Sequence, residues 1–475
     1  VGSACAMSAI IHIESDGWKS RLDEDFTEEN VVRIADAAGR VWSRTAPGAI
    51  VYVAYDARPE AERFACLVGR VLAGYGLAAM VSDRFAPTPA LAWTVAHDNR
   101  ACGGIMVTGS HNPYDYLGIK LYMDDGGIAS AEFAEEIEAS IEGEPSDVRG
   151  PIERRDIVLP YLDDLCTLVD GDAISRAHLT VVADPLYGST RTYLPAVMGA
   201  LGINVVEIHA EMDEGAEDMH PEPVEPWVDD CEQAVVEVGA DAGLVNDGDG
   251  IRMAAVDGAG RFITPHQIIA LLLEHLLVNR GERGRVVLGI SSSVLARRVA
   301  KNYDCRVVVK PVGFRHIYKE MCKGDILLGA EEAGGIALGS HMLERDGLLA
   351  ALLICELMAK SGKTLEQLAD DLSKTYGRTC YARRDLRVEA EVIDVFRTML
   401  PGLNPKTVAG REPVQVSHMD GLKLEFSDES WVLLRPSRTK PVVRVYAEAP
   451  SIQERDELLE AACDIARGEA GISGF

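Results

Sequence analysis

The chain has 475 residues, of which 47% are hydrophobic and 26% are charged, a composition typical of a globular protein with two to four domains. Its formal net charge is −28, and so strong an acidic excess disfavours nucleic acids and anionic membranes as partners, because both are polyanions. Small phosphorylated substrates remain compatible with this charge, since they need only a local pocket of positive side chains.

The cysteines are scattered along the chain, and none falls in a Cys-x-x-Cys pair, which disfavours a zinc site. Several lie in apolar runs, as Cys355 does, so we expect buried free thiols in a cytoplasmic protein. No apolar stretch reaches the roughly 20 residues of a membrane span. Residues 1–6 have neither a basic region nor a long apolar core, so we expect no secretory signal there and take Met7 as a candidate natural start.

Short β-branched runs alternate with helical patterns over most of the chain. Residues 50–54, 179–183 and 285–289 are predicted to form buried strands, and an amphipathic helix near 60–73 follows the first. Strands that alternate with helices indicate α/β layers. The plan occurs about three times at spacings above 100 residues, which suggests three related α/β units.

The C-terminal part differs from what precedes it. Residues 431–434 and 442–446 are predicted to be paired strands followed by a helix from about 452 to 467, which indicates a smaller α+β domain. Polar or Pro/Gly-bearing stretches mark candidate boundaries near 143–151, 256–264 and 361–376. We predict domains over residues 1–147, 148–260, 261–372 and 373–475.

The first candidate functional loop, residues 108–113, follows the apolar run 104–107. Ser110 lies just past a predicted strand among small, turn-forming residues, where a tight loop with exposed backbone N–H groups suits a phosphate. His111 adds a polar contact, and Lys120 lies ten residues further on. The alternative is an ordinary turn built of residues that favour turns.

The second candidate loop, residues 246–252, follows the apolar run 242–245. Asp247 and Asp249 stand two positions apart with a glycine between them, so their carboxylates can converge on a hard cation such as Mg²⁺. Without a cation their closeness would be repulsive. An acidic, glycine-rich surface turn is the alternative.

The third candidate loop, residues 329–335, also follows an apolar run. Its adjacent carboxylates, Glu331 and Glu332, are able to accept hydrogen bonds from sugar hydroxyls. A solvated turn is the competing interpretation of this segment.

The fourth candidate loop, residues 435–441, joins the two predicted C-terminal strands. It holds three cations and two hydroxyls within a short turn: Arg435, Ser437, Arg438, Thr439 and Lys440, with Arg444 beyond. Such a group can surround a phosphate, and it reverses the sign of an otherwise acidic chain. The alternative is a basic surface turn.

Taken together and in this order, the four loops resemble those of the α-D-phosphohexomutases. In that family the first loop carries a phosphorylated serine, the second binds Mg²⁺, the third contacts sugar hydroxyls, and the fourth holds the phosphate that is not transferred. Further matches extend the resemblance from about Ile13 to the end of the chain: Asp16-Gly17-Trp18 with Asp25-Phe26-Thr27, Arg84 followed by Pro87-Thr88-Pro89-Ala90, His220-Pro221-Glu222-Pro223, Pro311-Val312-Gly313-Phe314 and Glu344-Arg345-Asp346-Gly347.

The resemblance implies three related α/β domains with mixed sheets and a smaller, mobile C-terminal α+β domain around a central cleft. It implies interconversion of hexose 1-phosphate and hexose 6-phosphate, of glucose and/or mannose, through a phosphoserine and a hexose 1,6-bisphosphate that also serves as activator. It implies catalytic roles for Ser110, His111, Lys120 and Arg252, and Mg²⁺ binding by Ser110, Asp247 and Asp249. It implies substrate binding by Lys19, Arg315, Glu331, Ala333, Arg435, Ser437, Arg438, Thr439 and Arg444.

Several positions depart from the family pattern. Ile251 stands where the family has a third metal-binding carboxylate, and an alkyl group cannot ligate a cation. Ala333 replaces a usual serine of the sugar loop, and Lys440 a usual glutamate of the phosphate loop. Lys19 and Arg315 exchange arginine and lysine, which keeps the charge but changes the geometry. Leu117 replaces a usual asparagine.

Three interpretations therefore stay open. The first is an active phosphoglucomutase or phosphomannomutase, and the second an impaired or non-enzymatic relative that binds sugar phosphates. The third is a mutase for another sugar, such as glucosamine phosphate. Neither the preferred hexose nor the oligomeric state follows from the motifs.

Overall fold

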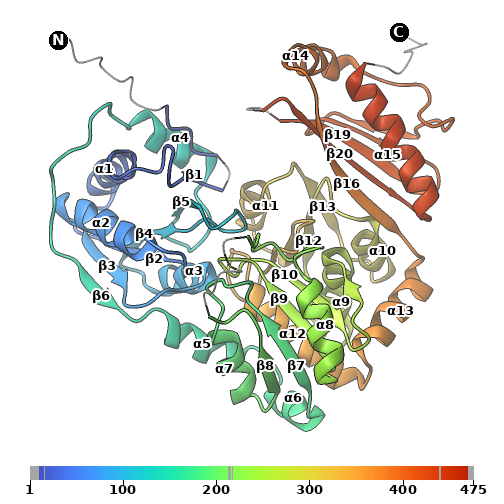
Figure 1. Ribbon diagram of the computed structural model, residues 1–475, viewed down its shortest axis with the longest axis horizontal. Coiled ribbons are helices and arrows are strands. Elements are labelled where there is room, and N and C mark those ends of the chain that lie inside the picture. Colours follow the sequence, from blue (N-terminus) through green and yellow to red (C-terminus); the bar gives the residue numbers. More distant parts are fainter. Residues whose placement is uncertain (1–9, 15, 212–215, 217, 438–439, 469–475) are drawn as a thin grey trace.

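The computed structural model describes residues 10–14, 16–211, 216, 218–437 and 440–468, which fold into four units in chain order (Figure 1). Each unit is built on one β-sheet; the first three sheets are mixed and the fourth is antiparallel. The expectation of three α/β domains and a smaller α+β domain is therefore confirmed.

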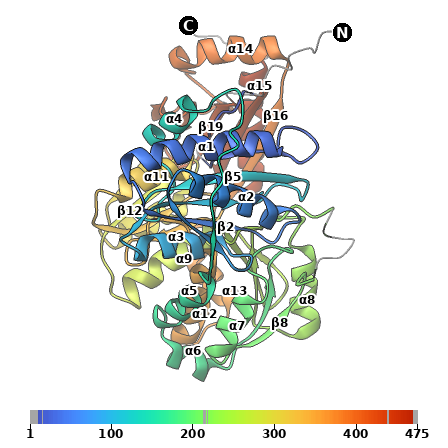
Figure 2. The same ribbon diagram turned by 90° about the vertical axis from the view of Figure 1, so that its left-hand side faces the viewer.

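The first sheet has the strand order β1-β5-β4-β2-β3-β6. Its strands are β1 (Trp18–Arg21), β2 (Ile50–Tyr55), β3 (Ala78–Ser82), β4 (Ala101–Val107), β5 (Tyr116–Tyr122) and β6 (Glu153–Arg155). Helices α1 (Glu28–Thr45), α2 (Ala61–Gly74) and α4 (Ala131–Ala139) cover one face, and α3 (Thr88–His97) covers the other (Figure 2). Because both faces are covered, every residue of β2 is buried, which explains its uninterrupted apolar run.

The second and third sheets have the orders β11-β10-β9-β7-β8 and β13-β12-β14-β15. The strands are β7 (Thr180–Asp184), β8 (Asn204–Glu207), β9 (Ala242–Asn246), β10 (Met253–Asp257), β11 (Phe262–Ile263), β12 (Arg285–Gly289), β13 (Val307–Lys310), β14 (Ile326–Ala330) and β15 (Ile336–Leu338). The helices are α5 (Val158–Thr167), α6 (Gly171–Ala177), α7 (Tyr193–Ala200), α8 (Asp229–Val238), α9 (Pro265–Val278), α10 (Val294–Asn302), α11 (Phe314–Met321), α12 (Gly347–Ser361) and α13 (Leu365–Tyr376).

One arrangement of four strands recurs in all three mixed sheets: β5-β4-β2-β3, β10-β9-β7-β8 and β15-β14-β12-β13. In each, a central strand pairs in parallel on both sides, and an antiparallel hairpin closes one edge. The first three candidate loops are the turns of these hairpins, β4–β5, β9–β10 and β14–β15. Their equivalent positions explain why motifs far apart in sequence have comparable places in the fold.

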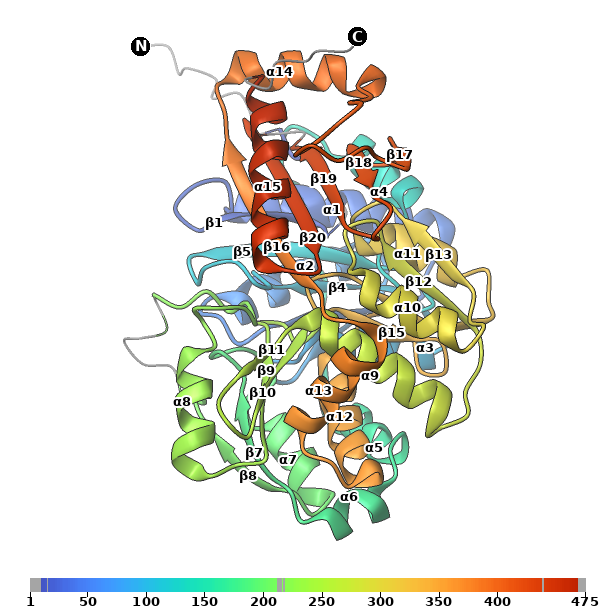
Figure 3. The same ribbon diagram turned by 90° about the vertical axis from the view of Figure 1, so that its right-hand side faces the viewer.

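The C-terminal unit is an antiparallel sheet in the order β16-β20-β19-β18-β17. Its elements are β16 (Cys380–Arg387), α14 (Ala390–Met399), the 3₁₀ helix η2 (Leu400–Gly402), β17 (Gln415–Ser417), β18 (Leu422–Glu425), β19 (Trp431–Pro436), β20 (Val442–Ala449) and α15 (Ile452–Arg467). Helix α15 lies along one face of this sheet (Figure 3). The fourth candidate loop is the turn between β19 and β20, as predicted.

Buried side chains join the first three units into one body. The largest hydrophobic cluster contains Leu91 of α3, Tyr161 of α5, Leu271 of α9 and Leu353 of α12. The C-terminal unit has a separate core between its sheet and its helices. No helix within the described ranges is both long and apolar enough to cross a membrane, and the described cysteines are all free thiols.

The segment 361–376 differs from its predicted role as a domain boundary. Most of it folds as α13, whose Thr364 cap and Gln367 form a capping box. The residues of the helix that pack inward recur at helical spacing: Leu365, Leu368, Ala369 and Leu372. A boundary between 372 and 373 would cut this helix, and we propose instead that the third domain ends after it.

Candidate active site

The hairpin turns of the first two domains meet at one pocket, which the N-terminal strand and a third-domain loop complete. Its lining residues are Asp16, Trp18, Lys19, Thr108, Gly109, Ser110, His111, Lys120, Ile251, Arg252 and Arg345. Four of these side chains are cations, which supplies a local positive charge in an otherwise acidic chain. The sequence-predicted Lys19, Ser110, His111, Lys120 and Arg252 are thus brought together.

Ser110 is buried, and its backbone has a φ of 51°, in the left-handed region that few residues other than glycine adopt. Its Oγ donates to Asp249 Oδ1 at 2.7 Å and lies 3.3 Å from Lys120 Nζ. Its backbone N–H donates to Thr108 Oγ1 at 2.8 Å. The hydroxyl is therefore fixed between a carboxylate and an ammonium group.

A buried arginine, Arg58, fixes the backbone around Ser110 by hydrogen bonds. Arg58 donates to the carbonyl oxygens of Ser110, Asn112, Pro113 and Tyr116. Its own orientation is fixed by Asp56, which accepts from Arg58 Nε at 3.1 Å. A Cβ atom at Gly109 would lie 2.3 Å from Arg58 Cζ, so only glycine fits above the guanidinium.

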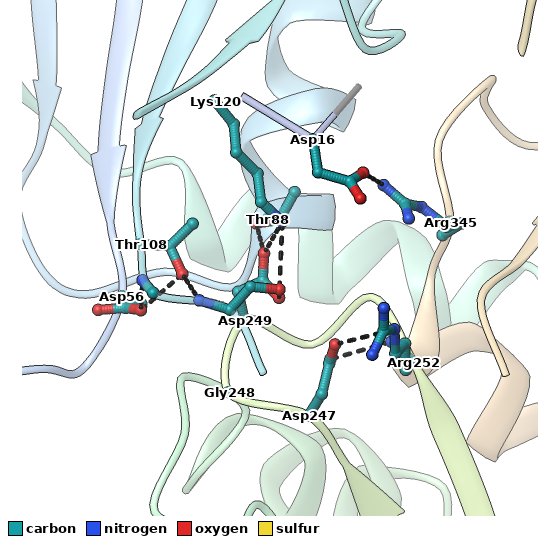
Figure 4. Close-up of polar contacts among 12 residues, drawn as sticks. Asp16, Asp56, Thr88, Thr108, Lys120, Asp247, Gly248, Asp249, Arg252 and Arg345 are labelled. Carbon is teal, nitrogen blue, oxygen red and sulfur yellow. Dashed lines mark hydrogen bonds and ion pairs between the residues drawn. The ribbon is translucent and has the colours of Figure 1, made fainter. Parts of the chain in front are cut away.

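Asp249 reaches from the second domain to three donors of the first (Figure 4). Its Oδ2 accepts from Thr88 Oγ1 and from Lys120 Nζ, each at 2.7 Å, and its Oδ1 accepts from Ser110. Burial alone would raise the pKa of this carboxyl, but Lys120 and the three hydrogen bonds outweigh burial and lower the pKa of Asp249. Asp249 is therefore ionised at neutral pH.

Asp247 points instead toward Arg252 (Figure 4). Its Oδ1 accepts from the Arg252 backbone N–H at 3.0 Å, while its buried Oδ2 has no hydrogen-bond partner among the described residues. Burial and the neighbouring Asp249 raise the pKa of Asp247 to about 7. An unsatisfied carboxylate oxygen of this kind is a position where a cation can bind.

The donor set for a metal ion is short by one residue. Ile251, where the resemblance places a third carboxylate, is 2% exposed and lines the pocket. Within the described part of the chain, no three His, Cys, Asp or Glu side chains are grouped to hold a metal ion. Asp247, Asp249 and the Ser110 oxygen remain as oxygen donors, and oxygen donors supplemented by several waters are the coordination that Mg²⁺ accepts.

His111 also faces this cluster of cations. Its Nδ1 is buried and has no hydrogen-bond partner among the described residues. Burial and the charges of Arg252, Lys19 and Lys120 lower the pKa of His111 well below its ordinary value. The imidazole is therefore neutral at neutral pH and has one ring nitrogen to accept a hydrogen bond and one to donate.

Asp16 and Arg345 line the same pocket, and their side chains point toward each other (Figure 4). Burial opposes ionisation of Asp16, but Arg345, Lys120 and Lys19 outweigh it and lower the pKa of Asp16 to about 2. Arg345 Nη2 lies 3.5 Å from Asp16 Oδ1. Neither residue is among the site residues predicted from the sequence.

Glu331 and Ala333, predicted from the third loop, are not among the residues that line this pocket, and Glu331 reaches its wall through Arg345. Glu331 is buried, and its Oε2 accepts from Arg345 Nη1 at 2.6 Å. Ala333 is partly buried in the same turn and has no polar group to offer. Arg315 is engaged with backbone carbonyls of the first domain, donating to Ala129 at 3.0 Å and to Glu14 at 2.7 Å.

The described residues of the fourth loop do not line this pocket. Arg435 donates through Nε to Asp420 at 2.7 Å, and Ser437 Oγ accepts from the Lys440 backbone N–H at 3.2 Å. Arg444 Nε lies 3.7 Å from an oxygen of Asp385. Arg438 and Thr439 lie outside the described residues.

Besides Asp16 and Arg345, three residues at or beneath the pocket are missing from the predicted site residues: Asp56, Arg58 and Thr88. Asp56 and Arg58 follow a fully buried strand, where a charged pair two positions apart is a usable signal. Thr88 and Arg345 lie within the landmark segments 87–90 and 344–347, but nothing in those segments shows which side chain reaches another domain.

Comparison with known families covers most of the chain. Models of the phosphoglucomutase/phosphomannomutase family match residues 12–147 (alpha/beta/alpha domain I), 160–260 (domain II), 264–376 (domain III) and 404–465 (C-terminal domain). These four matches occur in the order that the family models number them. They match the four units of the fold.

Individual relatives with similar sequences or structures also have phosphohexomutase names. A phosphoglucomutase/phosphomannomutase of Thermococcus kodakarensis is 30% identical over 94% of this chain and 96% of its own. A phosphoglucosamine mutase of a Parafrankia species is 31% identical over 92% of this chain and 94% of its own. The crystal structure of a protein assigned as phosphomannomutase from Thermus thermophilus has a TM-score of 0.86 and 31% identity, covering 97% of this chain and 99% of that one.

Proposed function

Because the chain belongs to the α-D-phosphohexomutase family, we propose that it interconverts hexose 1-phosphate and hexose 6-phosphate, with glucose and/or mannose as the hexose. The observation that carries the proposal is Ser110, whose Oγ lies between Asp249 and Lys120 in a pocket lined by four cations. A hydroxyl in that setting is suited to carry a phosphoryl group.

In the proposed reaction, phosphorylated Ser110 gives its phosphoryl group to the free hydroxyl of a hexose monophosphate. The bond from Ser110 Oγ to phosphorus breaks, a bond from the sugar oxygen to phosphorus forms, and a hexose 1,6-bisphosphate results. The bisphosphate then reorients in the cleft. The bond between its other phosphorus and the sugar oxygen breaks, and that phosphoryl group is transferred to Ser110. The same bisphosphate, bound from solution, would phosphorylate an idle enzyme and so act as activator.

The first transfer also moves one proton from the sugar hydroxyl to the Ser110 oxygen, and the second moves one from the Ser110 hydroxyl to the sugar oxygen that loses its phosphoryl group. Lys120 Nζ, 3.3 Å from Ser110 Oγ, is in reach to relay the proton. Arg252 and neutral His111 line the same pocket and are positioned to donate hydrogen bonds to phosphoryl oxygens.

The family is Mg²⁺-dependent, and Ser110, Asp247 and Asp249 are the residues that would hold the ion. When bound, it supplies neutralisation of charge on the transferred phosphoryl group. Lys120 donates to Asp249, so its ammonium group and a bound cation would compete for one carboxylate.

The second phosphate of the substrate is assigned to the fourth loop, with Arg435, Ser437, Arg438, Thr439 and Arg444 as its donors. Lys19, Arg315, Glu331 and Ala333 are assigned to the sugar and to the remaining contacts of the substrate. Closure of the C-terminal domain over this phosphate would keep water from the phosphoserine.

A coupled assay with glucose 1-phosphate, glucose 1,6-bisphosphate and Mg²⁺ tests the proposal. We expect turnover by the wild type, none by Ser110→Ala, and a phosphate on Ser110 in peptide mass spectra of enzyme incubated with the bisphosphate. Undiminished turnover by Ser110→Ala would refute the assigned carrier. Tight binding of glucose 6-phosphate without turnover would favour the impaired relative, for which the observation is Ile251 in the metal loop.

A phosphoglucosamine mutase is the second candidate, because several similar relatives carry that name at 28–31% identity. The same enzyme preparation assayed with glucosamine 6-phosphate distinguishes the two. A higher kcat/KM for the amino sugar than for glucose or mannose phosphates would assign the chain to this second activity.

A further inference from the structure

Arg345 is a fully buried cation whose position is fixed on three sides. Its Nε donates to Glu344 at 2.8 Å, and its Nη1 donates to Glu331 at 2.6 Å. Its guanidinium lies over the ring of Phe314, 4.5 Å from the ring centroid. With 1% of the side chain exposed, the guanidinium cannot move without breaking one of these contacts.

Gly335 in the third candidate loop, residues 329–335, has no side chain and so leaves room for this arginine. A Cβ atom at Gly335 would lie 2.5 Å from Arg345 Cδ and 3.1 Å from its Cγ. The space that any other residue at 335 would fill is therefore occupied by the stem of Arg345. As a result, the guanidinium of Arg345 lies against the turn that contains Glu331 and lines the pocket.

One nitrogen of the guanidinium makes no hydrogen bond within the described part of the chain. Nη2 is buried and has no hydrogen-bond partner among the described residues, and the same holds for the Asp16 Oδ1 atom that it faces at 3.5 Å. Buried polar groups are nearly always hydrogen-bonded, because leaving them unpaired is costly. The two groups form an ion pair at 3.5 Å, but each lacks a hydrogen bond to any described residue, and both lie at the wall of the pocket that holds Ser110, which indicates a place for a ligand atom.

The charges around this place select the ligand. A phosphate oxygen would meet Asp16 and Glu331, two carboxylates, and would be repelled by both. A hydroxyl can accept from Arg345 Nη2 and donate to Asp16 Oδ1 at the same time, so it satisfies both groups. Resting on the proposed function, we propose that Arg345 and Asp16 bind one ring hydroxyl of the hexose phosphate, as a donor–acceptor pair that helps to select the sugar.

The test is a binding cycle measured by calorimetry on the full-length protein. Glucose 6-phosphate and its 2-deoxy, 3-deoxy and 4-deoxy analogues are titrated into the wild type and Arg345→Met. We expect Arg345→Met to bind glucose 6-phosphate roughly ten- to a hundredfold more weakly, the loss expected for a hydrogen bond to a charged group. For one deoxy analogue, and only one, the difference between the two proteins should shrink to less than about threefold, because the bond is already absent.

Asp16→Asn provides a second variant in case Arg345→Met does not fold. Its side chain is 36% exposed, so the substitution leaves the core intact, and we expect the same single analogue to cancel its effect. Arg261→Met is the matched control, because it removes an exposed arginine ion pair away from the pocket and should bind every ligand as the wild type does.

The outcomes separate the two proposals. Binding of glucose 6-phosphate by wild type and unchanged affinity in both variants would overturn the assignment of Arg345 and Asp16 while leaving the function standing. Weakened binding in the variants, by the same factor for all four sugars, would also overturn it, because no hydroxyl is then singled out. A wild type that binds no hexose phosphate would remove both the function and the inference.

Discussion

At the scale of single residues, the guanidinium of Arg58 donates to four backbone carbonyls of one loop while only 2% of its side chain is exposed. Those carbonyls belong to the turn in which Ser110 takes a left-handed conformation. Strained backbone of this kind persists only where the surroundings hold it, and Arg58 with Asp56 provides that hold. The loop that carries Ser110 therefore depends on a pair that does not line the pocket itself.

We expect Arg58→Met to unfold at a lower temperature, because it leaves Asp56 as an uncompensated buried charge, at a cost of about 3–5 kcal/mol. Phosphorylation of Ser110 by glucose 1,6-bisphosphate should also slow, as followed by mass spectrometry. The control is Arg154→Met, which breaks a partly exposed ion pair with Glu62 in the same domain and should cost less than about 1 kcal/mol. Equal losses in the two variants would contradict the special role of Arg58.

A second prediction at this scale concerns Ile251 and the metal requirement. We expect Ile251→Asp to lower the Mg²⁺ concentration for half-maximal rate and to raise turnover, because the new carboxylate joins Asp247 and Asp249 in one loop. Without metal the variant should be less heat-stable than wild type, since three like charges then repel, and Mg²⁺ should restore its stability. Ile251→Asn, similar in size but uncharged, should show neither effect. A folded Ile251→Asp with wild-type metal dependence would show that position 251 does not face the cation.

At the scale of secondary-structure elements, the sequence predicts the strands well because buried parallel strands are continuous apolar runs. Residues 285–289 and 452–467 have the predicted bounds, and β2 extends one residue beyond its prediction. The same reasoning fails for 361–376, where a polar surface face hides the helix α13. Composition alone does not separate an exposed helix face from a linker.

The candidate site also has features that the sequence predicts and features that it does not. Motifs local in sequence, such as the turn that holds Ser110, are predicted, because tight spacing and turn chemistry are visible in one segment. Contacts between domains are not, because Thr88 on Asp249 or Arg345 beside Asp16 depends on how separate sheets pack. The common four-strand plan of the three mixed sheets is likewise invisible to a pattern search that sees only alternation of strands and helices.

The β19–β20 hairpin carries its own prediction. Arg435 is oriented by Asp420, which also accepts from the Val312 backbone N–H of the third domain at 3.0 Å. If this turn holds the phosphate that is not transferred, Arg435→Ala loses a hydrogen bond to a charged group, worth about 1.5–3 kcal/mol, and binds glucose 6-phosphate roughly one to two decades more weakly. Glucose itself should bind poorly to both proteins. The control is Arg384→Ala, which breaks an exposed pair with Glu460. Unchanged affinity in Arg435→Ala would show that the turn is misassigned.

At the scale of the whole molecule, the C-terminal domain is joined to the third by a buried contact. Glu448 accepts from the backbone N–H of Val294 at 2.9 Å, from the Ser293 hydroxyl and from the Trp431 indole at 2.7 Å. It therefore caps helix α10 of the neighbouring domain. Ile290, Trp431 and other side chains form a small hydrophobic cluster around it. The domain closure implied by the family must pivot on this contact or break it.

We expect Lys423 to make the stability of this junction depend on pH. Its Nζ is buried, donates to Ile290 O at 2.8 Å and lies 4.1 Å from the Trp431 ring centroid. Burial, with a contribution from Arg297, lowers the pKa of Lys423 from 10.5 to about 8. Between these values the unfolded chain binds more protons than the folded one, so stability from this group rises as pH increases.

Between pH 7.5 and 9.5 we expect the stability of the wild type to rise by about 2 kcal/mol relative to Lys423→Met, which has no group to titrate there. Thermal unfolding of both proteins at the two pH values measures the difference. The comparison with the variant cancels the other titrating groups that the two proteins share. If the free energy of unfolding of the wild type, relative to that of Lys423→Met, is the same at both pH values or is lower at pH 9.5, the assignment of the lowered pKa to Lys423 is wrong.

The equivalent hairpins of the first three domains have a consequence for the chain during its synthesis. Each domain presents the same kind of turn, but one turn carries Ser110, the next the carboxylates Asp247 and Asp249, and the last Glu331, so no domain holds a complete set. If the proposed function is correct, a growing chain, or one cut by a protease between domains, would lack part of the set needed to hold a sugar phosphate beside Ser110. Phosphoserine made before the domains assemble would then have only water as its acceptor, so the division of the site among domains would delay phosphoryl transfer until the cleft excludes water.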